Sequence, residues 1–322
     1  MKVSVITPVY KVSTFIERCA EALMRQTLED IEFIFVDDAS PDDSRAKLEA
    51  VIARYPGRNV RILTHERNLG LPSARKTGVG AATGDYIYNC DADDWPEITL
   101  VEKMYSAAVA ADADMVYCDF YLSFGQSERY MHNPVYSTPD EMLRKGFLSG
   151  DCKWNVWNKL IRRSLYEGVE FPVDHRKGGE DMIMIGMLSR AERIAYVPEA
   201  LYHYVKTNAE AISEGFSEQR LIDIQYNANS AIAALKGYPS DISAEIALFK
   251  LNVKLPFLLS DDKRKYRLWS EWYTEANDFI WKNAELPFRT KMLEWMASKG
   301  CWWYVRLYYK LVYKVIYGKI FK

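Results

Sequence analysis

The sequence is poor in cysteine, and its cysteines form no pattern. Five of them lie scattered along 322 residues, their number is odd, and no two stand in a Cys-x-x-Cys pair. A disulfide framework or a structural zinc site needs grouped or matched cysteines. We therefore expect reduced thiols, mostly in the core of a cytosolic protein, at Cys19, Cys90, Cys118, Cys152 and Cys301.

Long apolar runs are missing as well. No stretch reaches the roughly 18 apolar residues that a membrane-spanning helix requires, and residues 1–9 show none of the features of a signal peptide. We therefore expect the catalytic part to face the cytoplasm. The net charge of −2 gives no reason to expect nucleic acid as a partner.

The remaining composition is that of a globular protein. Hydrophobic residues make up 49% of the chain and charged residues 27%, which excludes wholesale disorder. The first hundred residues alternate short apolar runs with amphipathic segments, and this alternation predicts an α/β fold with a doubly wound, mostly parallel sheet. The predicted strands are Lys2–Thr7, Ile31–Val36, Val60–Leu63 and Asp85–Cys90.

The second half of the chain has a different character. A helix over Ser137–Phe147 and two short strands, Arg193–Val197 and Leu201–Lys206, are still compatible with the first domain. From about residue 216 the pattern becomes helical, with predicted helices over Leu221–Leu235, Ile242–Leu259 and Lys265–Trp281. We predict a first domain over residues 1–215 and a helical C-terminal region over residues 216–322.

Three acidic residues follow the fourth predicted strand within four positions. Asp91, Asp93 and Asp94 lie beyond its carboxyl end, because Pro96 stops the strand. In an open parallel sheet this edge is where ligands bind. Clustered carboxylates repel one another unless a cation neutralises them, and their oxygens suit Mg²⁺ or Mn²⁺. The alternative is a hydrated acidic turn.

A second acidic pair, Asp37-Asp38, ends the second predicted strand. Asp is favoured in turns that start a helix, and a carboxylate at this place can also accept a hydrogen bond from a base or a ribose. A strand that ends in Val-Asp-Asp also resembles a phosphorylation-receiver domain. That class needs an acceptor Asp after the next strand, and residues 60–64 contain none.

Two further stretches allow a structural and a functional interpretation. Glu180 and Asp181 follow two glycines and precede an apolar run, which is typical either of acids that cap a helix or of a general base on a mobile loop. Trp157, with Asn158 and Lys159 beside it, indicates either a core tryptophan or a partly open surface that binds a polyol or phosphate.

These stretches together resemble the inverting glycosyltransferases of family 2, which have the GT-A fold, and in particular members that build bacterial surface polysaccharides. The resemblance covers residues 2 to about 213. It rests on motifs in the family's order: Val3-Ser4-Val5-Ile6-Thr7-Pro8-Val9-Tyr10, Phe35-Val36-Asp37-Asp38-Ala39-Ser40, Asn68-Leu69-Gly70 with Ala74-Arg75, Gly84-Asp85-Tyr86-Ile87, Asp91-Ala92-Asp93-Asp94-Trp95, Asn155-Val156-Trp157-Asn158-Lys159-Leu160, Glu180-Asp181 and Leu201-Tyr202-His203-Tyr204. The family commonly has Gly where this chain has Ala39.

The resemblance implies roles for particular side chains. Asp38 would accept a hydrogen bond from uracil, Asp93 would bind the divalent ion at the diphosphate, and Asp181, beside Glu180, would be the general base. His203 would complete the metal site, or alternatively be a packed strand histidine. Nucleotide contacts are expected from Pro8, Tyr10, Asp37, Asp38, Asn68, Gly70, Arg75, Asp91 and Ala92, and acceptor contacts from Trp157, Asn158 and Lys159.

The resemblance therefore implies an inverting hexosyl- or N-acetylhexosaminyltransferase that depends on Mn²⁺ or Mg²⁺. It would move a sugar from a UDP-sugar to a saccharide or lipid-linked glycan during cell-surface polysaccharide synthesis. One alternative, a sugar-1-phosphate nucleotidylyltransferase, would need a glycine-rich phosphate loop after the first strand, and Thr7–Lys11 contains no glycine. The other alternative is a non-catalytic module that binds nucleotides or glycans.

The last 22 residues, 301–322, contain no acidic residue and five basic ones among many aromatic and aliphatic side chains. Arg306, Lys310 and Lys314 are four residues apart, so they lie on one side of a helix. We expect an interfacial helix on the anionic inner face of the cell membrane. The alternative is a helix that packs on its own domain or on the partner in a homodimer.

Overall fold

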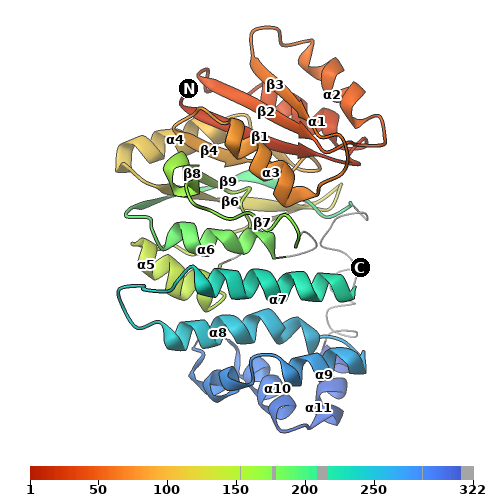
Figure 1. Cartoon of the computed structure of the whole chain (residues 1–322), viewed down its shortest axis with the longest axis vertical. Coiled ribbons are helices and arrows are strands. Elements are labelled where there is room, and N and C mark those ends of the chain that lie inside the picture. The colour runs from red at the N-terminus through yellow and green to blue at the C-terminus, as the bar shows by residue number, and fades with distance from the viewer. Residues whose placement is uncertain (153, 176–178, 209–216, 285, 313–322) are drawn as a thin grey trace. The chain divides into compact units, whose positions relative to one another are not determined.

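The computed structural model of the chain describes residues 1–152, 154–175, 179–208, 217–284 and 286–312 (Figure 1). The chain forms two compact units: Met1–Asp140 with Trp154–Leu235, and Glu141–Lys153 with Lys236–Lys322. The predicted domain boundary near residue 215 lies outside the described residues, and the helix that follows it groups with the first unit. The division at residue 215 thus stays a prediction.

Among the described residues, the first unit contains one nine-stranded mixed sheet in the order β3-β2-β1-β4-β8-β6-β9-β5, with β7 paired to β6. Strands β1 to β4 run parallel, β8 is antiparallel to both of its neighbours, and β9 is parallel to β6. The strands are β1 (Val3–Val9), β2 (Ile31–Asp37), β3 (Asn59–Thr64), β4 (Tyr86–Asn89), β5 (Trp95–Pro96), β6 (Met115–Ser123), β7 (Glu128–Met131), β8 (Lys159–Arg162) and β9 (Ile194–Val205).

Helices cover both faces of the parallel part of this sheet (Figure 1). On one face Leu23 of α1 shares a core with Phe33 of β2, and on the other face Ala74 of α3 packs on Ile34. Successive residues of β2 are therefore both buried, which explains its unbroken apolar run. The helices of this unit are α1 (Ile16–Met24), α2 (Ser44–Ile52), α3 (Leu71–Ala81), α4 (Leu100–Ala111), η2 (Arg163–Tyr166), η3 (Glu180–Met182), α6 (Ile183–Leu188) and α7 (Glu218–Ala233).

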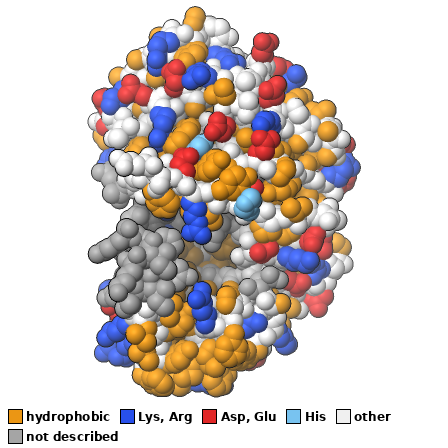
Figure 2. Space-filling view, turned by 180° about the vertical axis from the view of Figure 1, so that it is seen from behind, with side chains coloured by type: hydrophobic (Ala, Val, Ile, Leu, Met, Phe, Trp, Pro, Cys, Tyr) orange, Lys and Arg blue, Asp and Glu red, His pale blue; other side chains and the backbone are white. Residues whose placement is uncertain are grey.

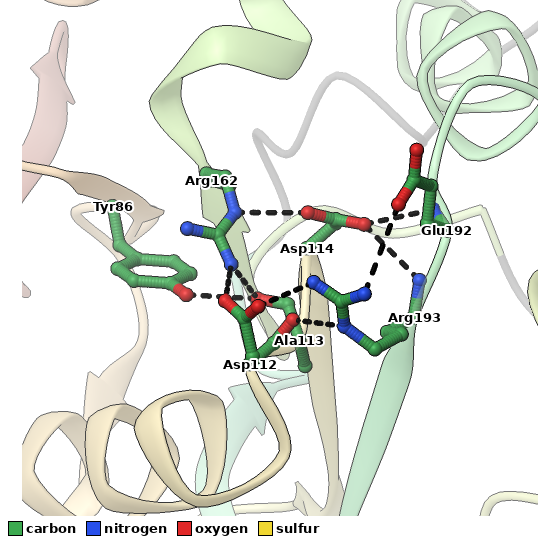
Figure 3. Close-up of polar contacts among 7 residues, drawn as sticks. All are labelled: Tyr86, Asp112, Ala113, Asp114, Arg162, Glu192 and Arg193. Carbon is green, nitrogen blue, oxygen red and sulfur yellow. Dashed lines mark hydrogen bonds and ion pairs between the residues drawn. The ribbon is translucent and has the colours of Figure 1, made fainter.

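A network of ion pairs ties the amino-terminal ends of β4, β6 and β9 together (Figure 3). Arg162 donates to Asp112 at 2.7 Å and to Asp114 at 2.8 Å, and the hydroxyl of Tyr86 donates to a backbone carbonyl of the same loop. Arg193 also pairs with Asp112. This network lies at the opposite end of β4 from the loop that carries Asp91, Asp93 and Asp94. It therefore anchors the sheet and takes no part in a ligand site at that loop.

The second unit is helical. Its core includes Leu251 of α8, Ile280 of η5 and Val305 of α11, all fully buried. Lys254 is buried as well, and its ammonium donates to the carbonyl of Trp272 at 2.9 Å. The helices are η1 (Met142–Leu148), which continues the short α5 (Pro139–Glu141), and α8 (Ser243–Lys254), η4 (Leu255–Phe257), α9 (Lys263–Glu271), η5 (Thr274–Lys282), α10 (Phe288–Ser298) and α11 (Trp302–Tyr308).

The cysteines have the environment that the sequence predicts. All five are free, four of them are buried, and Cys301 is partly exposed. Every helix within the described residues is too short or too polar to traverse a lipid bilayer.

Candidate active site

The three acids after β4 have different partners. Asp91 accepts a hydrogen bond from the guanidinium of Arg75 at 2.9 Å. Asp93 accepts from the amide of Asn208 at 2.8 Å. Asp94 is fully buried and accepts from the hydroxyl of Tyr202 at 2.8 Å, and also from a β9 amide. Asp94 therefore fastens the loop to β9, while Asp91 and Asp93 are the acids that are left partly accessible.

The pKa values of this cluster reflect its crowding. Burial, followed by the nearby charge of Asp91, raises the pKa of Asp93 above its ordinary value. Burial and the charges of Asp93 and Asp91 raise the pKa of Asp94 well above its usual range. A cation beside Asp93 would lower the cost of holding it ionised, because it offsets both effects.

Arg75 brings the acidic loop together with Asp181, which lies 106 residues further along the chain. The guanidinium is 4% exposed, projects from α3, and donates to Asp181 through one nitrogen and to Asp91 through another. Burial raises the pKa of Asp181, while the charge of Arg75 opposes the rise. Asp181 thus combines a partly accessible carboxylate with a strengthened basicity, as a general base requires.

Asp38 orients the loop before α3. It is 2% exposed and accepts hydrogen bonds from the amides of Leu69 and Gly70 at 2.8 and 2.7 Å. A ring nitrogen of His65 lies 2.7 Å from the same carboxylate. Gly70 has a φ of 89°, a conformation that favours glycine. The motif around residues 68–70 is therefore held in place by an acid at the end of β2.

The loops after β1 and β2 are joined to each other. The amide of Lys11 donates to the hydroxyl of Ser40 at 2.8 Å, and the amide of Ser40 donates to Asp37 at 3.0 Å. Tyr10, directly after β1, has an exposed side chain, and Pro8 near the end of β1 is half-buried. The two loops present an aromatic ring at the carboxyl ends of the strands, where a base can stack.

The expectation of an open surface at Trp157, Asn158 and Lys159 is wrong. All three side chains are buried, because the antiparallel strand β8 enters the middle of the sheet at Lys159. Trp157 stacks on Tyr202 with ring centroids 4.5 Å apart, and Lys159 donates to the side-chain oxygen of Asn158 at 2.7 Å. The interpretation of Trp157 as a core residue is the one that fits.

His203 occupies a packed position on β9. One ring nitrogen lies 2.8 Å from Glu128 and the other 3.0 Å from Glu97. The ring stacks on Trp95 with centroids 4.2 Å apart and also on Tyr121. Since both nitrogens already face carboxylates, the structure supports the packed-histidine alternative rather than a metal ligand.

Within the described part of the chain, no three His, Cys, Asp or Glu side chains converge as a ligand set for a metal ion. A divalent ion that is held by one carboxylate and by substrate phosphates needs no such set. Asp93 fits that arrangement, since it is partly accessible, accepts a hydrogen bond from the side chain of Asn208, and has a pKa raised by its surroundings.

Sequence reasoning assigned no role to Tyr202, Asn208 or His65. Their contacts with Asp94, Asp93 and Asp38 depend on how distant strands and loops meet. Tyr202 belongs to the motif Leu201-Tyr202-His203-Tyr204, but its partner Asp94 has no signal in the sequence. Glu180, which precedes Asp181 in the sequence, is the first residue of the 3₁₀ helix η3.

Comparison with known proteins agrees with this architecture. The curated protein named uncharacterized glycosyltransferase EpsJ, from Bacillus subtilis, is 32% identical over 273 residues, which is 80% of this chain and 77% of EpsJ. Glycosyltransferase GlyA of Streptococcus pneumoniae is 29% identical over 79% of this chain, but that alignment spans only 38% of GlyA. The crystal structure of S. aureus TarS 1–349 in complex with UDP-GlcNAc matches with a TM-score of 0.71 and 19% identity, and covers 96% of this chain and 92% of that one.

The mixed sheet with helices on both faces, shared with TarS, is the GT-A fold of glycosyltransferases, and the predicted fold class is confirmed. The sequence model described as "Glycosyl transferase family 2" matches residues 4–184. The chain belongs to glycosyl transferase family 2.

Proposed function

We propose that this glycosyltransferase moves a sugar from a UDP-sugar to a hydroxyl of a saccharide or lipid-linked glycan, with inversion, in the synthesis of a cell-surface polysaccharide. One observation carries the proposal: Arg75 joins Asp91 and Asp181 at the carboxyl end of β4, where Asp93 also lies. This contact brings the proposed donor site, at Asp91 and Asp93, close to the proposed general base, Asp181. The UDP donor is chosen because TarS, which has the same fold, was crystallised with UDP-GlcNAc.

The donor's nucleoside is proposed to bind over the loops after β1 and β2. Tyr10 supplies an exposed ring for the base, with Pro8 beside it. A carboxylate has about four lone-pair sites, and Asp38 uses three of them within the protein, so one remains for a base N–H. The remaining proposed contacts come from Asp37, Asn68, Gly70, Arg75, Asp91 and Ala92.

Asp93 is proposed to hold a divalent cation, Mn²⁺ or Mg²⁺, together with the diphosphate. When bound, such an ion supplies Lewis-acid neutralisation of the charge that develops on the leaving diphosphate. Asp94 and Asn208 position the loop and the Asp93 carboxylate for this contact. His203 is not part of the proposed site.

Asp181 is proposed to accept the proton of the acceptor hydroxyl on one of its carboxylate oxygens. The hydroxyl oxygen then forms a bond to the anomeric carbon from the face opposite the diphosphate. The bond from that carbon to the diphosphate oxygen breaks, and its electron pair leaves with the nucleoside diphosphate. Arg75 orients the base, and burial raises its pKa so that it takes the proton more readily.

The test compares two variants with a control acid next to the other end of β4. Asp181→Asn should keep metal-dependent UDP binding in calorimetry but lose transfer by at least about a hundredfold, since an amide cannot take the proton. Asp93→Ala should lose the metal-dependent part of UDP binding. Asp85→Asn, an exposed acid at the other end of β4, should change neither.

Wild-type transfer should also fall as the pH drops through the raised pKa of Asp181, because the protonated acid is no base. Unimpaired transfer by Asp181→Asn would remove it as the base.

Thermal shift with UDP-, GDP- and dTDP-sugars and Mn²⁺ then identifies the donor. No stabilisation by any of these donors would contradict the proposed function.

A further inference from the structure

The second unit leaves several large apolar side chains uncovered. Trp281, Phe288 and Trp303 are 47%, 68% and 65% exposed. The ring centroid of Trp281 lies 5.8 Å from that of Phe288 and 6.3 Å from that of Trp295. Hydrophobic side chains gather over the C-terminal helices in the lower part of Figure 2. The aromatic surface is defined here as Trp281, Phe288, Trp295, Trp303, Leu307 and Leu311.

Helix α11 shows that this exposure is confined to one side. Its inner side packs on its own unit, since Val305 is fully buried and Trp302 stacks on Tyr266 with centroids 5.3 Å apart. Its outer side exposes Trp303 and, four residues on, Leu307, where a soluble surface usually carries charge. The helix is therefore held by its own unit and still presents an apolar side.

Over α10, α11 and the described residues after them the exposed charged groups have one sign, whereas η5 also exposes Glu275 and Asp278. In residues 279–312 the exposed basic side chains are Lys282, Arg289, Lys299, Arg306 and Lys310. Of the two acids in that range, Glu294 is buried and Glu285 lies outside the described residues. Among the described residues, no carboxylate lies within ion-pair distance of Lys299, Arg306 or Lys310. The following ten residues add three lysines and no acid.

We infer that the aromatic surface and its basic residues bind an anionic membrane surface. Tryptophan rings are favoured at the depth of lipid headgroups, and lysine and arginine are attracted to anionic lipids. A second copy of the chain fits less well, because it would bring two predominantly basic surfaces together. The surface extends beyond the C-terminal segment to η5 and α10, so membrane binding would not depend on that segment alone.

The experiment measures flotation of the full-length protein with vesicles of phosphatidylcholine, with and without phosphatidylglycerol. We expect binding only to the vesicles with phosphatidylglycerol, and release by high salt. Trp281→Ser and Trp303→Ser should each weaken binding on the order of tenfold. Arg306→Gln and Lys310→Gln should each weaken it about fivefold.

The matched controls are Val109→Ser in α4 and Ile222→Ser in α7, which are equally exposed apolar residues of the first unit. They should bind vesicles as the wild type does. Equal flotation of the tryptophan variants and the wild type, or no flotation of the wild type, would overturn the inference. A dimer in light scattering that only the tryptophan variants dissociate, with vesicle binding unchanged, would assign the surface to a second copy.

Discussion

Ala39 has a φ of 55°, a left-handed backbone in which an L side chain is strained. It follows Asp38, whose carboxylate organises the loop before α3. Ala39→Gly should raise the free energy of unfolding by about 1 kcal/mol, because glycine removes the clash of the Cβ with the backbone. Urea denaturation measures the change.

The control for this prediction is Ala110→Gly, at an exposed position of α4. Glycine there should lower the stability by about 1 kcal/mol. If both substitutions lowered stability alike, Ala39 would carry no strain that glycine relieves. The φ of Ala39 is thus a physical reason to expect glycine to be favoured at this position.

At the scale of single residues, the site residues that could be predicted are those that lie close to one another in the sequence. Asp91 and Asp93 were identifiable because they stand together after one strand. The link from Arg75 to Asp181 was not, since it depends on how α3 meets a loop that is distant in sequence. The burial of Asn158 and Lys159 was equally hidden, because no local pattern shows that β8 inserts antiparallel into the sheet.

At the scale of elements, the contact of α3 with β1 sets the position of Arg75. A Cβ on Gly78 would stand 2.3 Å from the Cγ2 of Ile6, whereas a Cβ on Gly80 would meet nothing within 4 Å. Gly78→Ala should therefore destabilise the protein by about 1–3 kcal/mol through overpacking. It should also reduce donor binding, because α3 must shift.

Gly80→Ala is the matched control in the same helix and should stabilise the protein by about 1 kcal/mol through helix propensity. Denaturation curves and UDP calorimetry of both variants check the pair. If Gly78→Ala were as stable as Gly80→Ala, the packing of α3 on β1 would not hold the helix in place.

Elements that are buried on both faces were the easiest to predict. Strands β1 to β4 agree with the predicted runs within a few residues. The two strands predicted around Pro198 are one strand, β9, in which irregular pairing with β6 accommodates the proline. The predicted helix Lys265–Trp281 is interrupted at Tyr273, whose φ is 47°. Neither the irregular pairing of β9 nor this interruption has a signal in local composition.

At the scale of the whole molecule, stability should depend on pH through Glu294. It is fully buried, and neither carboxylate oxygen has a hydrogen-bond partner among the described residues. Burial raises its pKa from 4.5 to about 7, against the opposing charge of Lys254. Between these pH values the folded state keeps a proton that the unfolded state releases, so the stability falls as the pH rises, by about 3 kcal/mol.

Glu294→Gln should reduce this fall by about the 3 kcal/mol that Glu294 contributes, because the amide does not titrate, whereas the exposed Glu66→Gln should leave it unchanged. Urea denaturation at pH 4.5 and pH 7 measures the difference. A wild type that is equally stable at both values would show that the buried carboxyl is ionised throughout.

The bridge from Arg75 to Asp91 and Asp181 has a consequence for the balance of charge at the proposed site. With all three groups ionised, two carboxylates and one guanidinium leave a single surplus negative charge, and Asp93 adds another. A diphosphate bound there would be repelled by this surplus charge, because the guanidinium of Arg75 is already paired with Asp91 and Asp181. This charge balance supports the proposal that a divalent cation binds together with the donor.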